Sequence, residues 1–65
     1  MHLTINQQTH QLPADAKVSD AIHAIDARPP FAVAVNTVFV PKTQYNQHRL
    51  HHGDRVEIIS PVTGG

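Results

Sequence analysis

The period of the apolar positions changes several times along the chain, and each change predicts a new element. Residues 2–6, His-Leu-Thr-Ile-Asn, alternate polar and apolar side chains, which is typical of a half-buried strand. Residues 6–8 are expected to form a turn, and residues 9–12 to return as a second strand. Residues 13–16, Pro-Ala-Asp-Ala, break the pattern. The chain is therefore predicted to begin with a β-hairpin.

A helical period follows this break. Apolar residues recur at intervals of three and four residues. This spacing predicts one apolar helical stripe, formed by Val18, Ala21, Ile22 and Ile25. Asp20 in the first turn and Arg28 near the last turn suit the helix dipole. Pro29-Pro30 is expected to end the helix, because proline removes a donor and disfavours helical geometry in the preceding residue.

The next segment is apolar and rich in β-branched residues. Residues 31–35, Phe-Ala-Val-Ala-Val, predict a central strand because neither face carries a polar side chain. Asn36-Thr37 is expected to turn the chain into residues 38–40, Val-Phe-Val. This antiparallel neighbour is expected to end before Pro41.

The last part of the chain completes a single α+β domain over residues 1–65. Residues 42–50 form a polar connection that allows one short helical turn, and Gly53-Asp54 is a tight turn before a strand over residues 55–60. The order β-β-α-β-β-β favours one helix packed across one face of a mixed sheet. The predicted core comprises Leu3, Ile5, Val18, Ile22, Ile25, Val33, Val35, Val38, Val40, Leu50, Val56 and Ile58.

Composition excludes several function classes. The chain has no cysteine, so it offers neither a disulfide nor a thiolate nucleophile or metal ligand. Five Lys and Arg balance five Asp and Glu, which removes the attraction to phosphate that nucleic-acid binding requires. With no signal peptide and no apolar run of membrane-spanning length, we expect a cytoplasmic protein without a membrane partner.

The sequence ends in Gly64-Gly65, and this pair is the candidate for chemistry. Glycine lacks a Cβ atom, so two glycines can pass through a slot too narrow for a side chain. The terminal carbonyl is also unhindered toward a nucleophile. We therefore expect a flexible tail over residues 61–65 whose reactive group is the Gly65 carboxylate, with Gly64 beside it.

An ordered set of motifs resembles the ThiS sulfur carriers of thiamine biosynthesis. The motifs are residues 18–22 (Val-Ser-Asp-Ala-Ile), 31–36 (Phe-Ala-Val-Ala-Val-Asn), 38–41 (Val-Phe-Val-Pro), 50–59 (Leu-His-His-Gly-Asp-Arg-Val-Glu-Ile-Ile) and Gly64-Gly65. Gln7 stands where that family often has glycine. Residues 61–65 look more like MoaD, the small subunit of molybdopterin synthase. In either case the resemblance implies a β-grasp, or ubiquitin-like, fold.

The resemblance to ThiS implies a carrier and not an enzyme. A ThiF-type adenylyltransferase would use ATP to adenylate the Gly65 carboxylate. A sulfur donor, such as the persulfide of a cysteine desulfurase, would convert it to a thiocarboxylate, and thiazole synthase (ThiG) would receive the sulfur. No bound cofactor is expected, because the partner uses the ATP. The alternatives are a MoaD-like carrier, a ubiquitin-like modifier joined through Gly65 to an amine, and a β-grasp interaction domain.

The partner must also bind a folded surface. Alternation places Phe39 and Ile59 on the sheet face opposite the helix, and large apolar residues on a bare face indicate a docking patch. Exposed apolar residues without a partner are the alternative. Pro61 is expected to stiffen the exit from the last strand, while Val62 and Thr63 either contact the wall of the partner's channel or remain in solvent.

Histidines are the other unusual feature. His48, His51 and His52 cluster before the Gly53-Asp54 turn, and Asp54 could join them as a metal ligand. Adjacent histidines in a loop tend to diverge, however, and no cysteine assists them. We expect histidines on a polar surface loop and no physiological metal. Nor does any combination of residues place a nucleophile beside a base and an orienting group, as catalysis would require.

Overall fold

The structure is a computed structural model that describes residues 1–60 of the chain. Its elements follow the order β1 (His2–Ile5), β2 (Gln8–Gln11), α1 (Val18–Ala24), β3 (Ala32–Val35), β4 (Val38–Val40), the 3-10 turn η1 (Lys42–Gln44) and β5 (Arg55–Ile59). Predictions about Pro61, Val62, Thr63, Gly64 and Gly65 lie outside the described residues.

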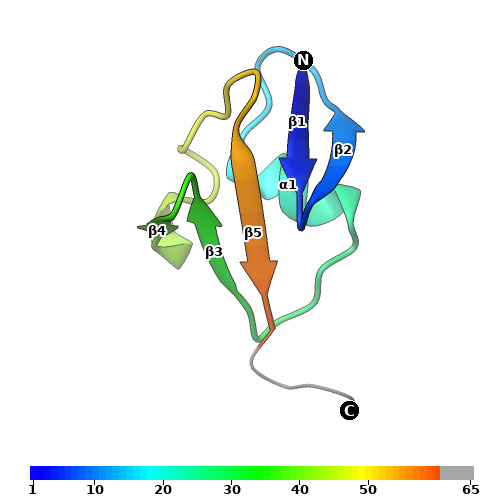
Figure 1. The fold of residues 1–65 in the computed structure, drawn as a ribbon. Coiled ribbons are helices and arrows are strands. Elements are labelled where there is room, and N and C mark those ends of the chain that lie inside the picture. Colours follow the sequence, from blue (N-terminus) through cyan, green and yellow to red (C-terminus); the bar gives the residue numbers. More distant parts are fainter. Residues whose placement is uncertain (61–65) are drawn as a thin grey trace.

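The strands form one five-stranded mixed sheet in the order β2-β1-β5-β3-β4. β5 pairs parallel to β1 and antiparallel to β3, so the last strand in the sequence occupies the centre of the sheet. The helix α1 lies behind the sheet in Figure 1 and crosses only one of its faces. Within residues 1–60, no helix is both long enough and apolar enough to cross a membrane.

Both hairpins turn through two residues with positive φ. The angles are 51° and 71° at Asn6 and Gln7, and 52° and 70° at Asn36 and Thr37. Such turns match the right-handed twist of the paired strands, and asparagine tolerates this geometry better than other non-glycine residues. Thr37 is unfavourable there because it is β-branched. The two turns fix the register of β1 with β2 and of β3 with β4.

The helix begins as expected but ends earlier. Its first turn is capped by Asp20, whose carboxylate accepts a hydrogen bond from the Lys17 N–H at 2.8 Å. Asp26 then adopts φ 52°, and its N–H donates to the His23 carbonyl at 3.1 Å. The Ala27 N–H donates to the Ile22 carbonyl at 3.0 Å, which completes a Schellman cap. The prediction that Arg28 lies near the last helical turn is therefore wrong.

The core fills the space between α1 and the covered face of the sheet. Apolar side chains buried there are Leu3, Ile5, Ala16, Val18, Ala21, Ile22, Val33, Val35, Val40, Leu50, Val56 and Ile58. Ten of the twelve predicted core residues are among them. Ile25 instead packs half-buried against the edge of the core, because the helix has already ended at Ala24.

Val38 is the clear error in the predicted core, because 65% of the residue is exposed. It shares an alternation face with Val40, which is 1% exposed. Both lie on β4, which is one of the two edge strands of the sheet. Val38 is the first residue of β4, directly after the turn at Asn36 and Thr37, where the core no longer covers it. Alternation gave the correct face, but only the position of the covering residues decides burial.

Candidate functional site

The end of β5 determines where the tail leaves the domain. β5 is held between β1 and β3, and its last residue, Ile59, pairs with Ala32 at the beginning of β3. The Ser60 hydroxyl donates a hydrogen bond of 3.5 Å to the Pro30 carbonyl. Gly65 follows Ser60 by five residues in the sequence. The candidate reactive group is therefore attached to the central strand of the sheet and not to a peripheral loop.

The open face of the sheet, opposite α1, divides into two unlike halves. The strand register places polar side chains over β1 and β2: His2, Thr4, Thr9 and Gln11. Apolar side chains lie over β3, β4 and the end of β5: Ala32, Ala34, Phe39 and Ile59. We call this second group the apolar patch. It borders the point from which the tail departs.

Two large residues and two small ones make up the apolar patch. Phe39 is 65% exposed and lies opposite Ala34, whereas Ile59 is 56% exposed and lies opposite Ala32. The predicted exposure of both large residues is confirmed. Their role in partner binding stays a prediction. The alanines between them leave the phenyl ring and the isoleucine side chain standing above their neighbours, where an apolar surface could contact them.

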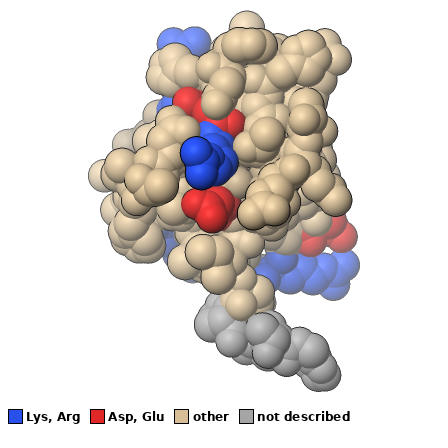
Figure 2. Space-filling view, in the orientation of Figure 1, with Lys and Arg blue, Asp and Glu red and all other residues tan. Residues whose placement is uncertain are grey.

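Charged side chains separate the two halves of the open face. Arg55 and Glu57 alternate with the buried Val56 and Ile58 along β5, so they point to the open side. In the space-filling view, acidic and basic side chains gather along the middle of this face with uncharged surface on both sides (Figure 2). The apolar patch thus has a polar border, as protein interfaces commonly do.

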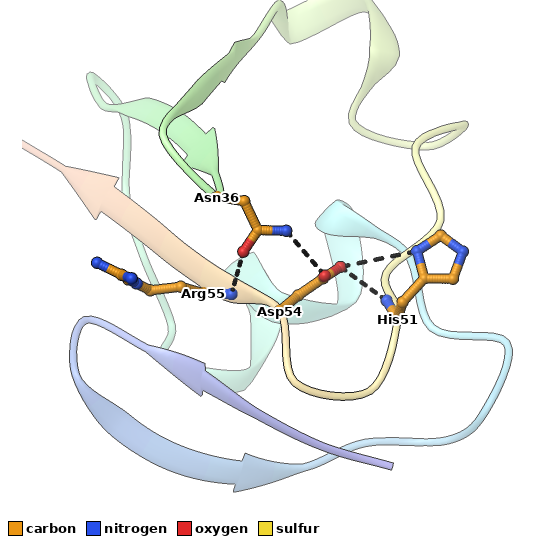
Figure 3. A network of polar contacts seen from close by, with 4 residues as sticks. All are labelled: Asn36, His51, Asp54 and Arg55. Carbon is orange, nitrogen blue, oxygen red and sulfur yellow. Dashed lines mark hydrogen bonds and ion pairs between the residues drawn. The ribbon is translucent and has the colours of Figure 1, made fainter.

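The other end of β5 is fixed by a polar network (Figure 3). The Asp54 carboxylate accepts hydrogen bonds from the Asn36 amide at 2.9 Å and from the His51 N–H at 2.8 Å. The Asn36 Oδ1 atom accepts a hydrogen bond from the Arg55 N–H at 2.9 Å. These contacts join the loop before β5 to the second hairpin turn, so we interpret the network as structural.

The clustered histidines point to different partners. The Nδ1 atom of His51 lies 3.8 Å from the Asp54 carboxylate, while His52 Nδ1 accepts a hydrogen bond from the His2 N–H at 3.1 Å. His48 contributes its backbone carbonyl, which accepts from the Val18 N–H at 3.0 Å. Among residues 1–60, no group of three or more histidine and acidic side chains could hold a metal ion.

Sequence reasoning identified both hairpin turns but missed what their asparagine side chains do. Asn6 bonds to the backbone of Ile58, and Asn36 to the backbone of Arg55 and the side chain of Asp54. Asparagine before a turn residue is a local signal for positive φ. It carries no information about a distant strand, and Ile58 is 52 residues from Asn6 in the sequence.

Comparison with known proteins decides the family. The family model of ThiS matches residues 2–65. The chain belongs to the ThiS family. It is 30% identical over 66 residues to the sulfur carrier protein ThiS of Escherichia coli (strain K12), and the match covers all of both chains. The resemblance to ThiS is thereby confirmed.

A solved structure confirms the fold. The thiamine biosynthesis protein ThiS from Geobacter metallireducens superposes with a TM-score of 0.81, and the match covers all of both chains. The identity to this ThiS structure is 20%, so it shows the fold alone. The predicted β-grasp, ubiquitin-like architecture, with one helix across a mixed sheet, is confirmed.

Proposed function

We propose that this ThiS family chain is a sulfur carrier of thiamine biosynthesis and acts through the carboxylate of Gly65. The observation that carries the proposal is the family match over residues 2–65, which includes Gly64-Gly65. A ThiF-type adenylyltransferase activates the carboxylate, and thiazole synthase (ThiG) receives the sulfur. The chain is a co-substrate in this scheme, and its partners supply the catalytic groups.

Activation is needed because a carboxylate is a poor electrophile. The Gly65 carboxylate attacks the α-phosphorus of ATP, which forms an acyl-adenylate and releases pyrophosphate. The terminal sulfur of a donor persulfide, such as that of a cysteine desulfurase, then attacks the acyl carbon and expels AMP. A thiol cleaves the resulting sulfur–sulfur bond and leaves the thiocarboxylate. Transfer of that sulfur and addition of water regenerate the carboxylate.

The contribution of the carrier is to position this carboxylate. Five residues reach at most about 18 Å when fully extended, so the folded domain must dock close to the entrance of the adenylation site. The apolar patch borders the end of β5 and supports docking of that kind. The tail then passes along the partner's channel, whose wall is contacted by Pro61, Val62 and Thr63. The channel leads to a closed site, where exclusion of water protects the acyl-adenylate from hydrolysis.

Variants of the diglycine test the need for a narrow passage. Gly65→Ala and Gly64→Ala should fold like the wild type but lose nearly all adenylation, because each adds a Cβ atom in the channel. ATP–pyrophosphate exchange measures this step, and thermal unfolding provides the control for folding. Near-normal exchange by both variants would refute the threading argument.

The decisive experiment is an intact mass measurement after incubation with ATP, a persulfide donor and the ThiF-type enzyme of the same organism. A gain equal to the exchange of one oxygen for sulfur, localised to Gly65, would support the carrier. Transfer of this sulfur to ThiG would favour the thiamine pathway over a MoaD-like role. Attachment to a lysine amine would instead identify a modifier, and no activation by an active partner would favour an interaction domain.

A further inference from the structure

The parallel ladder between β1 and β5 is shorter than β5 itself. It pairs Thr4 with Arg55 and Ile5 with Val56, and β1 then ends at Ile5. β5 continues to Ile59. The backbone N–H and carbonyl of Ile58 face the β1 side, where β1 has already ended. A central strand is therefore left without a strand neighbour on one side just before the tail begins.

Asn6 takes the place of the missing strand neighbour. Its backbone N–H donates to the Val56 carbonyl at 2.9 Å, which continues the ladder by one bond. Its side chain then reaches Ile58, where Oδ1 accepts from the N–H at 2.8 Å and Nδ2 donates to the carbonyl at 3.2 Å. A planar amide has a donor and an acceptor side by side, so it can replace a peptide group here.

We propose that Asn6 is a positioning residue for sulfur activation. It holds the final residues of β5 in line with the sheet and so directs the following segment, including Gly65, toward the partner. On the other side, Ile59 is held by its pairing with Ala32 of β3. This inference rests on the proposed function, because it concerns delivery of the Gly65 carboxylate to the adenylating enzyme.

Asn36 offers a matched control at the opposite end of the same strand. Its φ of 52° equals that of Asn6 to within one degree, and its N–H donates to the Arg55 carbonyl at 2.8 Å. Its Oδ1 atom accepts from the Arg55 N–H at 2.9 Å (Figure 3). Each asparagine therefore bonds to β5 through its backbone N–H and its side-chain amide. The Asn36 contacts lie at Arg55, at the beginning of the strand, whereas the Asn6 side chain reaches Ile58, near its end.

Glycine is the informative replacement at both positions. Asn6→Gly and Asn36→Gly each remove the side-chain amide while keeping a residue that accepts positive φ without strain. Backbone amide exchange should quicken at Ile58 in Asn6→Gly and at Arg55 in Asn36→Gly. Thermal unfolding of both variants shows whether they remain folded, and each should lose some stability because hydrogen bonds to β5 are lost.

The functional readout is ATP–pyrophosphate exchange at varied carrier concentration with the ThiF-type enzyme. For Asn6→Gly we expect the KM for the carrier to rise about tenfold, because about one loosened residue must be ordered on binding. The value of kcat should stay within about twofold, since the partner holds the tail once it has entered. Asn36→Gly should keep the wild-type KM despite its own loss of stability.

Three outcomes are distinguishable. The expected split between the two variants, with faster exchange at Ile58, supports the positioning role. An active wild type with equal KM values for Asn6→Gly and Asn36→Gly would overturn the inference and leave the proposed function intact. A wild type that the active partner does not adenylate would overturn the proposed function, and the positioning role with it.

Discussion

Both faces of the sheet carry large apolar side chains, but only one face is covered. On the face beneath α1, Val40 is 1% exposed and Val56 is fully buried. On the open face, Phe39 is 65% exposed and Ile59 is 56% exposed. Residues 1–60 contain one α-helix, and it covers only one of the two faces. Apolar residues therefore form the core on one face and remain exposed to solvent on the other, where we expect a partner to bind.

Val40→Ala should produce the largest effect, a loss of about 2 kcal/mol in the free energy of unfolding, because it opens a cavity in the core. For a domain of 65 residues the total stability is of the order of 3–10 kcal/mol, so this loss is large. Val38→Ala, on the same strand and the same alternation face, should change stability by less than about 0.5 kcal/mol. Chemical denaturation measures both values.

Equal losses for Val40→Ala and Val38→Ala would contradict the burial difference that separates the two positions.

Phe39→Ser tests the open face and should act on binding instead. We expect the dissociation constant for the ThiF-type enzyme to rise about tenfold, because an aromatic contact at the centre of an interface is lost. Stability should change little, since Phe39 is already largely exposed. Isothermal titration calorimetry of the carrier with the enzyme measures the affinity.

Val38→Ser is the matched control for that measurement. Val38 is also 65% exposed but points to the opposite side of β4 from Phe39. Its substitution should leave the affinity unchanged. An equal weakening by both variants would mean that the partner binds the edge of β4 and not the open face.

Thr37→Gly should give the smallest effect and raise the free energy of unfolding by about 1 kcal/mol. Thr37 adopts φ 70°, which is strained for a β-branched residue and open to glycine. The turn sets the register of β3 with β4, and a slip by one residue would exchange the two faces of β4. Thermal unfolding measures the gain.

Thr9→Gly provides the contrast for Thr37→Gly, because Thr9 lies within β2 and not in a turn. Glycine there should destabilise the domain. A loss of stability in Thr37→Gly as well would show that the positive φ at this position is not a source of strain.

The sequence predicted the local features of this domain well. Period and alternation identified the helix, the hairpins and the face of almost every strand residue, because these depend on neighbours a few positions away. The ordered motifs and Gly64-Gly65 pointed to the ThiS family, which the comparisons confirmed. Gly65 as the reactive group remains a prediction, since residues 61–65 lie outside the described part.

Only the tertiary structure decided the features that depend on distant contacts. The early helix end left Ile25 half-buried, and the limits of the covering layer left Val38 exposed. The attachment of Asn6 to Ile58 joins residues 52 positions apart. Periodicity reports which way a side chain points along its own element. Burial and long-range hydrogen bonds depend on what lies opposite, and that is determined when the chain is folded.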